Sequence, residues 1–299
     1  MPVRGGSSLK ALAVAATVFV SCGIASSASV AAPSDGSRSF VVRTPHVEGP
    51  AKYDRAFVNA YGRKNADDVL ILMPGTFGGA GDFTLAAKEM VRKNRNLQVW
   101  ALDRREQALE DTSMFEKGLK GKATLQEVYD YYLGFLIDPS VADHIQFLDT
   151  STVPFAKDWG MTTVLNDTRA VVKLARKSGK RVILGGHSVG ASLAISYAAW
   201  DFKGRPGYKD LDGLVLIDGG LLGSFDPYNL PQAQEAMATM DNPAIGPFSS
   251  LITNLPPETA GHFASVLVLI SYVLPNEPAT ALQESPLLPA SHIPLYAAD

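Results

Sequence analysis

The amino-acid sequence predicts an α/β fold: a doubly wound, mostly parallel sheet with helices on both faces. Three observations lead to this prediction. Continuous apolar runs of strand length recur along the chain, as in strands that are buried on both faces of a parallel sheet. Amphipathic segments of helical length separate these runs. One run, Val182–Gly185, leads directly into Gly186-His187-Ser188-Val189-Gly190, after which small and apolar residues continue in a helical pattern.

The composition is that of an ordinary globular protein. The chain has 299 residues, of which 46% are hydrophobic and 19% are charged, enough for one large domain with a substantial core. The net charge of −3 and the absence of a basic stripe argue against nucleic acid as a partner. We expect neither a cofactor nor a bound metal.

Residues 1–31 are predicted to be an export signal. They contain two positive residues, an apolar run and a small-residue cleavage site: Arg4, Lys10, Ala11–Val20 and Ser29-Val30-Ala31. The only cysteine, Cys22, has a setting like that of a bacterial lipobox, so lipidation and membrane attachment are an alternative to simple secretion. An uncleaved anchor is a third possibility. We therefore expect a protein that is secreted or associated with the cell envelope.

The core, predicted at residues 32–220, begins with a candidate edge strand at 39–43. Asp68–Met73 is a continuous apolar run, the pattern of a strand buried on both faces, and it stops at the glycine-rich run Pro74–Gly81. Residues 82–93 are predicted to form a helix. Leu97–Leu102 is the next strand and is followed by Asp103.

Residues 104–158 are too many for a short strand-to-helix connection, and we interpret them as an insertion near the active site. They include a predicted helix around 125–135 that is rich in aromatic residues. In 159–177 the apolar residues recur at helical spacing, which predicts an amphipathic helix before the Ser188 strand. Gly213–Ile217 is a further buried strand and ends at Asp218.

The pentapeptide around Ser188 has the local pattern of a nucleophile. A buried strand, a tight turn and a helix together lift a serine hydroxyl clear of the backbone, where it can attack a carbonyl. A side chain at Gly186 or Gly190 would collide where the strand and the helix cross. The glycine clusters match neither a P-loop nor G-x-G-x-x-G, which argues against nucleotide binding.

Residues 221–299 differ in character, because they are rich in proline, acidic, and without any lysine or arginine. We predict a cap or lid region at 221–292 and the start of a further core strand at 293–299. The apolar run Phe263–Leu274 is too short to span a bilayer. It is either a cap helix that lines an apolar pocket or a buried helix that does not contact the substrate.

These features together resemble the α/β-hydrolase family. The resemblance rests on the Ser188 elbow, on Pro74-Gly75-Thr76 after an earlier strand, and on Asp218 after a later one. It extends over residues 65–220, and over 221–299 only in the order of elements. It implies that Ser188 forms a covalent acyl intermediate.

The resemblance also implies the groups that would assist Ser188. The backbone N–H groups of Val189 and Thr76 would bind the oxyanion, with Phe77 as the fallback for Thr76. The alternative for the glycine-rich loop is a plain tight turn. Asp218 occupies one of two places where the family has the triad carboxylate; it is equally a candidate for a structural cap of its strand.

The resemblance does not supply a catalytic histidine within the chain. The family has this residue after the strand that follows the one ending at Asp299, so we expect a chain that lacks the C-terminal part of the domain. A rewired triad that uses His262 or His292 is the alternative.

We therefore expect an exported serine hydrolase, most plausibly a carboxylic-ester hydrolase, that acts on a small ester-like substrate with an apolar portion. One alternative is a catalytically inactive binding protein that keeps the hydrolase fold, and another is a peptidase on that fold. The oligomeric state is left open by the sequence.

Overall fold

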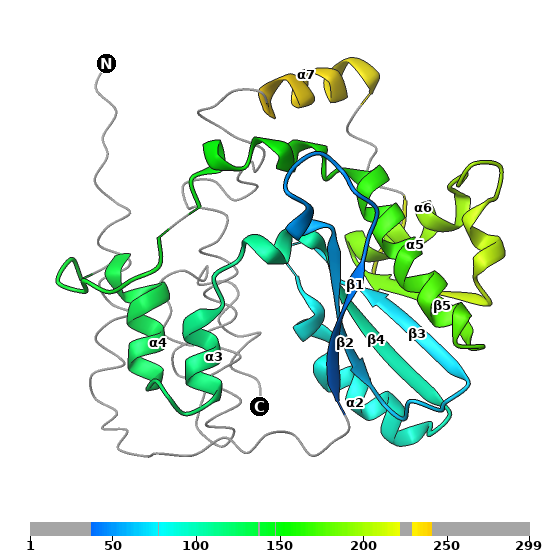
Figure 1. Cartoon of the computed structure of the whole chain (residues 1–299), viewed down its shortest axis with the longest axis horizontal. Coiled ribbons are helices and arrows are strands. Elements are labelled where there is room, and N and C mark those ends of the chain that lie inside the picture. Colours follow the sequence, from blue (N-terminus) through cyan, green and yellow to red (C-terminus); the bar gives the residue numbers. More distant parts are fainter. Residues whose placement is uncertain (1–36, 77, 137, 147, 222–228, 241–299) are drawn as a thin grey trace, which may run out of the picture. The chain divides into compact units, whose positions relative to one another are not determined.

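The computed structural model describes residues 37–76, 78–136, 138–146, 148–221 and 229–240 (Figure 1). The described residues form two compact units. The larger comprises residues 37–110 and 148–240, and the smaller comprises residues 111–146. The predicted export signal with Cys22, nearly all of the predicted cap and the predicted strand at 293–299 lie outside the described residues.

The larger unit is built on a mixed, mostly parallel sheet of six strands in the order β1-β2-β4-β3-β5-β6. The pairs β1·β2 and β2·β4 are antiparallel, and β4·β3, β3·β5 and β5·β6 are parallel. The strands are β1 Arg38–Arg43, β2 Arg55–Tyr61, β3 Asp68–Met73, β4 Leu97–Asp103, β5 Arg181–His187 and β6 Gly213–Ile217. The predicted fold class is therefore confirmed.

The α-helices of the larger unit are α2 Thr84–Lys93, α5 Met161–Lys177, α6 Val189–Ala199 and α7 Leu230–Met240. Helix α2 connects β3 to β4, α5 precedes β5, α6 connects β5 to β6, and α7 follows β6. Shorter 3-10 helices are η1 Ala51–Tyr53, η2 Ala80–Phe83, η3 Arg105–Leu109, η5 Thr150–Thr152, η6 Pro154–Asp158 and η7 Gly207–Asp210.

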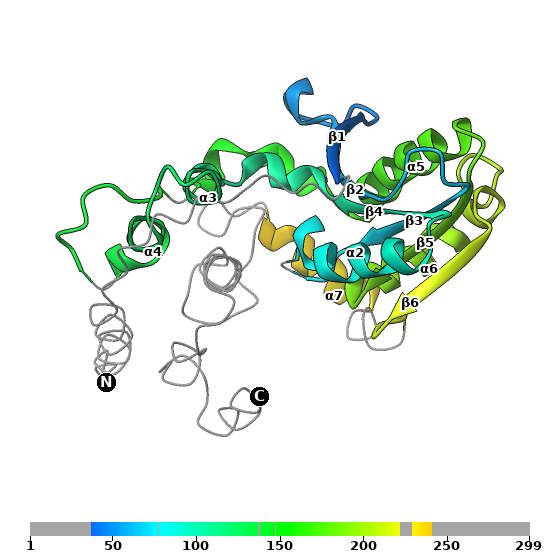
Figure 2. The ribbon, with the colours of Figure 1, turned by 90° about the horizontal axis from the view of Figure 1, so that it is seen from below.

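Two apolar clusters cover the two faces of the sheet. Because successive side chains of a strand point to opposite faces, Val69 and Ile71 join the cluster with α5 and α6, whereas Leu70 and Leu72 join the cluster with α2. Figure 2 shows α5 and α2 on opposite sides of the sheet. The continuous apolar run in β3 follows from this burial on both faces.

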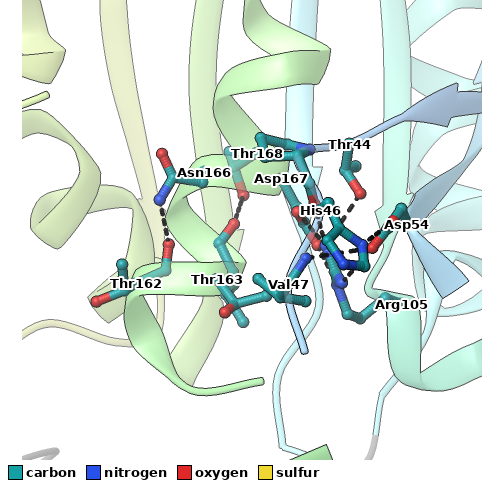
Figure 3. Close-up of polar contacts among 12 residues, drawn as sticks. Thr44, His46, Val47, Asp54, Arg105, Thr162, Thr163, Asn166, Asp167 and Thr168 are labelled. Carbon is teal, nitrogen blue, oxygen red and sulfur yellow. Dashed lines mark hydrogen bonds and ion pairs between the residues drawn. The ribbon is translucent and has the colours of Figure 1, made fainter. Parts of the chain in front are cut away.

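A buried ion network joins the hairpin of β1 and β2 to η3 and α5 (Figure 3). The Arg105 guanidinium is 1% exposed and forms two hydrogen bonds of 2.7 Å with the Asp167 carboxylate. It also donates to Asp54 at 3.3 Å and to the Thr44 hydroxyl at 3.0 Å. The outer end of the network is His46, whose Nδ1 lies 2.7 Å from Asp54 Oδ2. Three segments that are distant in sequence are thereby tied together.

The smaller unit has a core of its own, formed by α3 Ser113–Leu119, α4 Leu125–Tyr132 and η4 Gly134–Leu136. Helices α3 and α4 lie side by side (Figure 1). The predicted helix at 125–135 ends at Tyr132, and a 3-10 turn follows. Thr124 and Glu127 form a capping box at the start of α4. Among the described residues, no helix has both the length and the apolar character needed to cross a bilayer.

Candidate active site

Ser188 stands between the end of β5 and the start of α6, at the carboxyl end of a central parallel strand. Its backbone has φ 53° and ψ −122°, a conformation that side-chain-bearing residues rarely adopt. Its N–H donates to the Ile217 carbonyl at 3.0 Å, and its carbonyl accepts from Ala191 N–H at 3.0 Å. Such strain costs about 1–3 kcal/mol and occurs mostly at functional sites. The predicted strand, turn and helix are all present.

The glycines of the pentapeptide are required by close contacts. A Cβ at Gly190 would lie 2.2 Å from the Met73 carbonyl oxygen, and one at Gly186 would lie 2.4 Å from the carbonyl carbon of Gly190. Both distances are far below van der Waals contact, so α6 can cross β5 and β3 this closely only without side chains at 186 and 190.

The loop after β3 lies directly against the elbow. A Cβ at Gly75 would lie 3.3 Å from Ser188 Cβ and 3.2 Å from His187 Nδ1. Thr76, the next residue, is exposed, and Val189 is the first residue of α6. Neither the N–H of Thr76 nor that of Val189 donates a hydrogen bond to another described residue. The structure therefore brings the predicted nucleophile and the segment with the predicted oxyanion donor together.

Asp218 follows β6 with φ 43°, and its side chain is exposed. Its backbone lies beside the elbow, because the preceding residue, Ile217, accepts the hydrogen bond from Ser188 N–H. Within the part of the chain that the structure describes, no histidine contacts the Asp218 carboxylate. Its assignment as the triad acid stays a prediction.

Three of the five histidines are described, and none of them forms a hydrogen bond with Ser188. His46 pairs with Asp54, and His144 stacks on Phe135 within the smaller unit, with ring centroids 4.2 Å apart. His187 is exposed and lies against Gly75. His262 and His292 lie outside the described residues.

Two carboxylates lie behind the loop that follows β3, and we did not predict a role for either of them. Asp103 is 5% exposed and accepts a hydrogen bond of 2.6 Å from Ala80 N–H. Burial raises the pKa of Asp103 to about 6, although the Ala80 hydrogen bond and the charge of Arg104 lower it. Burial likewise raises the pKa of Asp82, against the Gly79 N–H and the charge of His187. The feature of the sequence that could have drawn attention to Asp103 is its position at the end of a buried strand.

Among the described residues, no group of histidine, cysteine or carboxylate side chains has an arrangement that could hold a metal ion. The groups that the described part of this site contains are a strained serine, backbone N–H donors, the buried carboxylate of Asp103 and the exposed carboxylate of Asp82.

Comparison with known proteins gives a family match over most of the chain. Residues 69–294 match the model of the alpha/beta hydrolase family. A search among curated proteins finds no relative.

Solved structures with low sequence identity also align with the chain. A candidate lipase from Sulfolobus solfataricus is 14% identical with a TM-score of 0.42; the alignment covers 81% of this chain and 59% of that one. A protein of unknown function from Staphylococcus aureus subsp. aureus Mu50 is 13% identical with a TM-score of 0.37; the alignment covers 84% of this chain and 73% of that one. Brefeldin A esterase, a bacterial homologue of human hormone-sensitive lipase, is 15% identical with a TM-score of 0.32; the alignment covers 100% of this chain and 67% of that one. The present chain thus spans about three fifths of the Sulfolobus protein, and none of these likenesses supports a more specific statement.

Proposed function

Because the chain belongs to the α/β-hydrolase family, we propose that it is a serine hydrolase that cleaves an ester or related acyl bond through an acyl-enzyme on Ser188. One observation carries this proposal. Ser188 is held at φ 53° on a strand-to-helix turn, with the Gly75 loop packed against its Cβ. A hydroxyl in this position is presented to a substrate carbonyl, and the N–H groups of Thr76 and Val189, which donate to no other group among the described residues, can stabilise the oxyanion.

The proposed reaction has two steps. The Ser188 oxygen forms a bond with the substrate carbonyl carbon, the negative charge moves to the carbonyl oxygen, and the N–H groups of Thr76 and Val189 donate to that oxygen. The C–O bond of the leaving alcohol then breaks as the proton that the base took from Ser188 passes to the alcohol oxygen. Water, giving a proton to the same base, then attacks the acyl group; the acid leaves and Ser188 regains its proton. Loss of one oxyanion donor typically costs about 3 kcal/mol of transition-state stabilisation.

The serine also needs a base that takes its proton. His262 and His292 are the two histidines of this chain outside the described residues, and they are the first to test. Asp218 is the carboxylate that we propose to orient the base, because it lies next to Ile217 in the chain and so near the elbow backbone.

The test is covalent labelling of the full chain with a fluorophosphonate, which reacts with activated serines. We expect the wild type to be labelled at Ser188 and S188A to be unlabelled. The matched control is S192A, one helical turn further along α6, where the hydroxyl is buried rather than presented to solvent. Absence of label on the wild type, or equal labelling of S188A, would contradict an activated serine and favour the inactive binding protein.

The same variants separate an esterase from a peptidase. We expect the wild type to hydrolyse a chromogenic ester such as p-nitrophenyl butyrate and to leave the matching p-nitroanilide intact at the same concentration. Faster cleavage of the anilide, abolished in S188A, would instead identify a peptidase. A hydrolysis rate that is equal in S188A and in the wild type would mean that Ser188 takes no part.

A further inference from the structure

We propose that Asp103 is a positioning residue for this reaction: it fixes the segment Pro74–Ala80 so that the N–H of Thr76 faces the developing oxyanion. This inference rests on the proposed function, since Thr76 is an oxyanion donor only if Ser188 is the nucleophile. Asp103 itself does not contact the reacting atoms.

The first support is the contact between Asp103 and the loop. Asp103 ends β4, and its Oδ1 accepts the Ala80 N–H at 2.6 Å. Hydrogen bonds from N–H to an ionised carboxylate are shorter and stronger than bonds between neutral groups. Gly79 packs on the same oxygen, because a Cβ there would lie 3.0 Å from Asp103 Oδ1. The carboxylate thus bonds to Ala80 and lies close against the backbone of Gly79.

The second support is that the other end of the same loop contacts the nucleophile. Gly75 lies against Ser188 and His187, and Gly78 N–H donates to the Gly75 carbonyl at 3.2 Å, which makes the segment a tight turn. Thr76 lies between the end packed on the elbow and the end bonded to Asp103. A shift of Ala80 therefore moves the Thr76 N–H, and oxyanion stabilisation depends steeply on such geometry.

The charges around Asp103 determine how its hold on the loop depends on pH. From its own segment it is faced by Arg104, Gln107 and Glu110, and from η2 by Asp82, which in turn faces His187 of β5. The carboxylates and burial oppose ionisation of Asp103, whereas Arg104 and the hydrogen bonds from Ala80 and Gln107 favour it. The pKa of Asp103 is therefore raised to about 6, so that the carboxylate loses its charge in mild acid. The hold on Ala80 weakens as the pH falls through this value.

The experiment compares D103A and D103N in the full chain. D103A removes the acceptor, and we expect kcat for p-nitrophenyl butyrate to fall about 10- to 100-fold at pH 8 with KM within about twofold. D103N keeps an oxygen that can accept the Ala80 N–H without titrating, so we expect it to retain most of kcat. The matched control is D210N, which changes an equally buried carboxylate on η7 that is paired with Arg205. It should lower the melting temperature without changing kcat.

The pH profile gives a readout that a purely structural role would not change. Protonated Asp103 keeps an oxygen that can accept the Ala80 N–H, as the amide of D103N does, so its protonation should lower kcat only a few-fold. As the pH falls through about 6, kcat of the wild type should therefore show a drop of about two- to fivefold that is absent from D103N. Unchanged kcat in D103A, or the same drop in D103N, would overturn the proposal.

A second measurement does not require turnover. The amide proton of Ala80, followed by NMR, should titrate with an apparent pKa near 6 in the wild type and remain constant in D103N. A constant shift in the wild type would overturn the role of Asp103 even if the ester is hydrolysed. Conversely, the Ala80 amide of the wild type could titrate near pH 6 while S188A hydrolyses the ester at the wild-type rate. That combination would overturn the proposed function and would leave the contact between Asp103 and Ala80 intact.

Discussion

Gly190 is the residue whose replacement we expect to disturb the elbow most. In G190A the new methyl group would lie 2.2 Å from the Met73 carbonyl oxygen, which is part of β3 and cannot move aside easily. We expect a loss of about 1–3 kcal/mol in the free energy of unfolding, measured by urea denaturation, and loss of fluorophosphonate labelling.

The control for this substitution is G81A, because no atom lies within 4 Å of a Cβ at Gly81. It should unfold at nearly the wild-type urea concentration. A G190A protein as stable as G81A would show that α6 has room to move away from β3.

Residue by residue, the sequence predicted those parts of the site that depend on local pattern. Ser188 and its glycines could be identified because strand, turn and helix are contiguous in the chain. The role of Asp103 could not be predicted, since its partner Ala80 is 23 positions away and a carboxylate after a strand has many possible functions. The same ambiguity left Asp218 open between catalysis and capping.

Among the elements, the parallel strands were predictable and β2 was not. Strands buried on both faces produce continuous apolar runs, and β3, β4 and β5 have that pattern. Strand β2 lies between β1 and β4 with alternating burial, and its buried positions include the small residues Ala56 and Ala60. Its strand character comes from its neighbours in the sheet rather than from its own hydrophobicity.

The network of Arg105 should be important for stability, because it links three segments of the larger unit that are distant in sequence. R105M would leave the Asp54 and Asp167 carboxylates buried without their cation, and breaking a buried pair from one side typically costs about 3–5 kcal/mol. We expect a loss of this size in the free energy of unfolding, measured by denaturant titration at pH 7.

The control for R105M is R181M. Arg181 forms a comparable bidentate pair with Asp68, but its side chain is 68% exposed. Exposed pairs contribute about 0–1 kcal/mol, so R181M should be close to the wild type. If R105M and R181M lowered the free energy of unfolding equally, burial of the ion pair would not be the reason for the large effect expected of R105M.

For the whole molecule, the two units should respond separately to mutation. Tyr132 of the smaller unit is fully buried; its hydroxyl accepts the N–H groups of Met114 and Phe115 and donates to the Asp111 carbonyl. Y132F removes these three hydrogen bonds to backbone groups, at a cost of about 1–3 kcal/mol. By hydrogen exchange we expect faster exchange within residues 111–146 and unchanged protection of β3 and β5.

The control is Y131F, because the hydrogen bonds given for the Tyr131 hydroxyl are with the side chains of Asp111 and Ser113 rather than with the backbone. It should change exchange in the smaller unit much less. Faster exchange of β3 or β5 in Y132F would mean that the two units unfold as one.

The backbone conformation of Ser188 also affects which substitutions evolution favours at this position. Glycine reaches φ 53° without the steric penalty that serine incurs there, so S188G is the substitution by which the fold gains stability at the elbow. A lineage that no longer used the hydroxyl would be under no pressure to keep serine and would be favoured for losing it. Across related chains, glycine at this position would therefore indicate a hydrolase fold that has become a pure binding protein. The serine found here lowers the stability of the elbow relative to glycine.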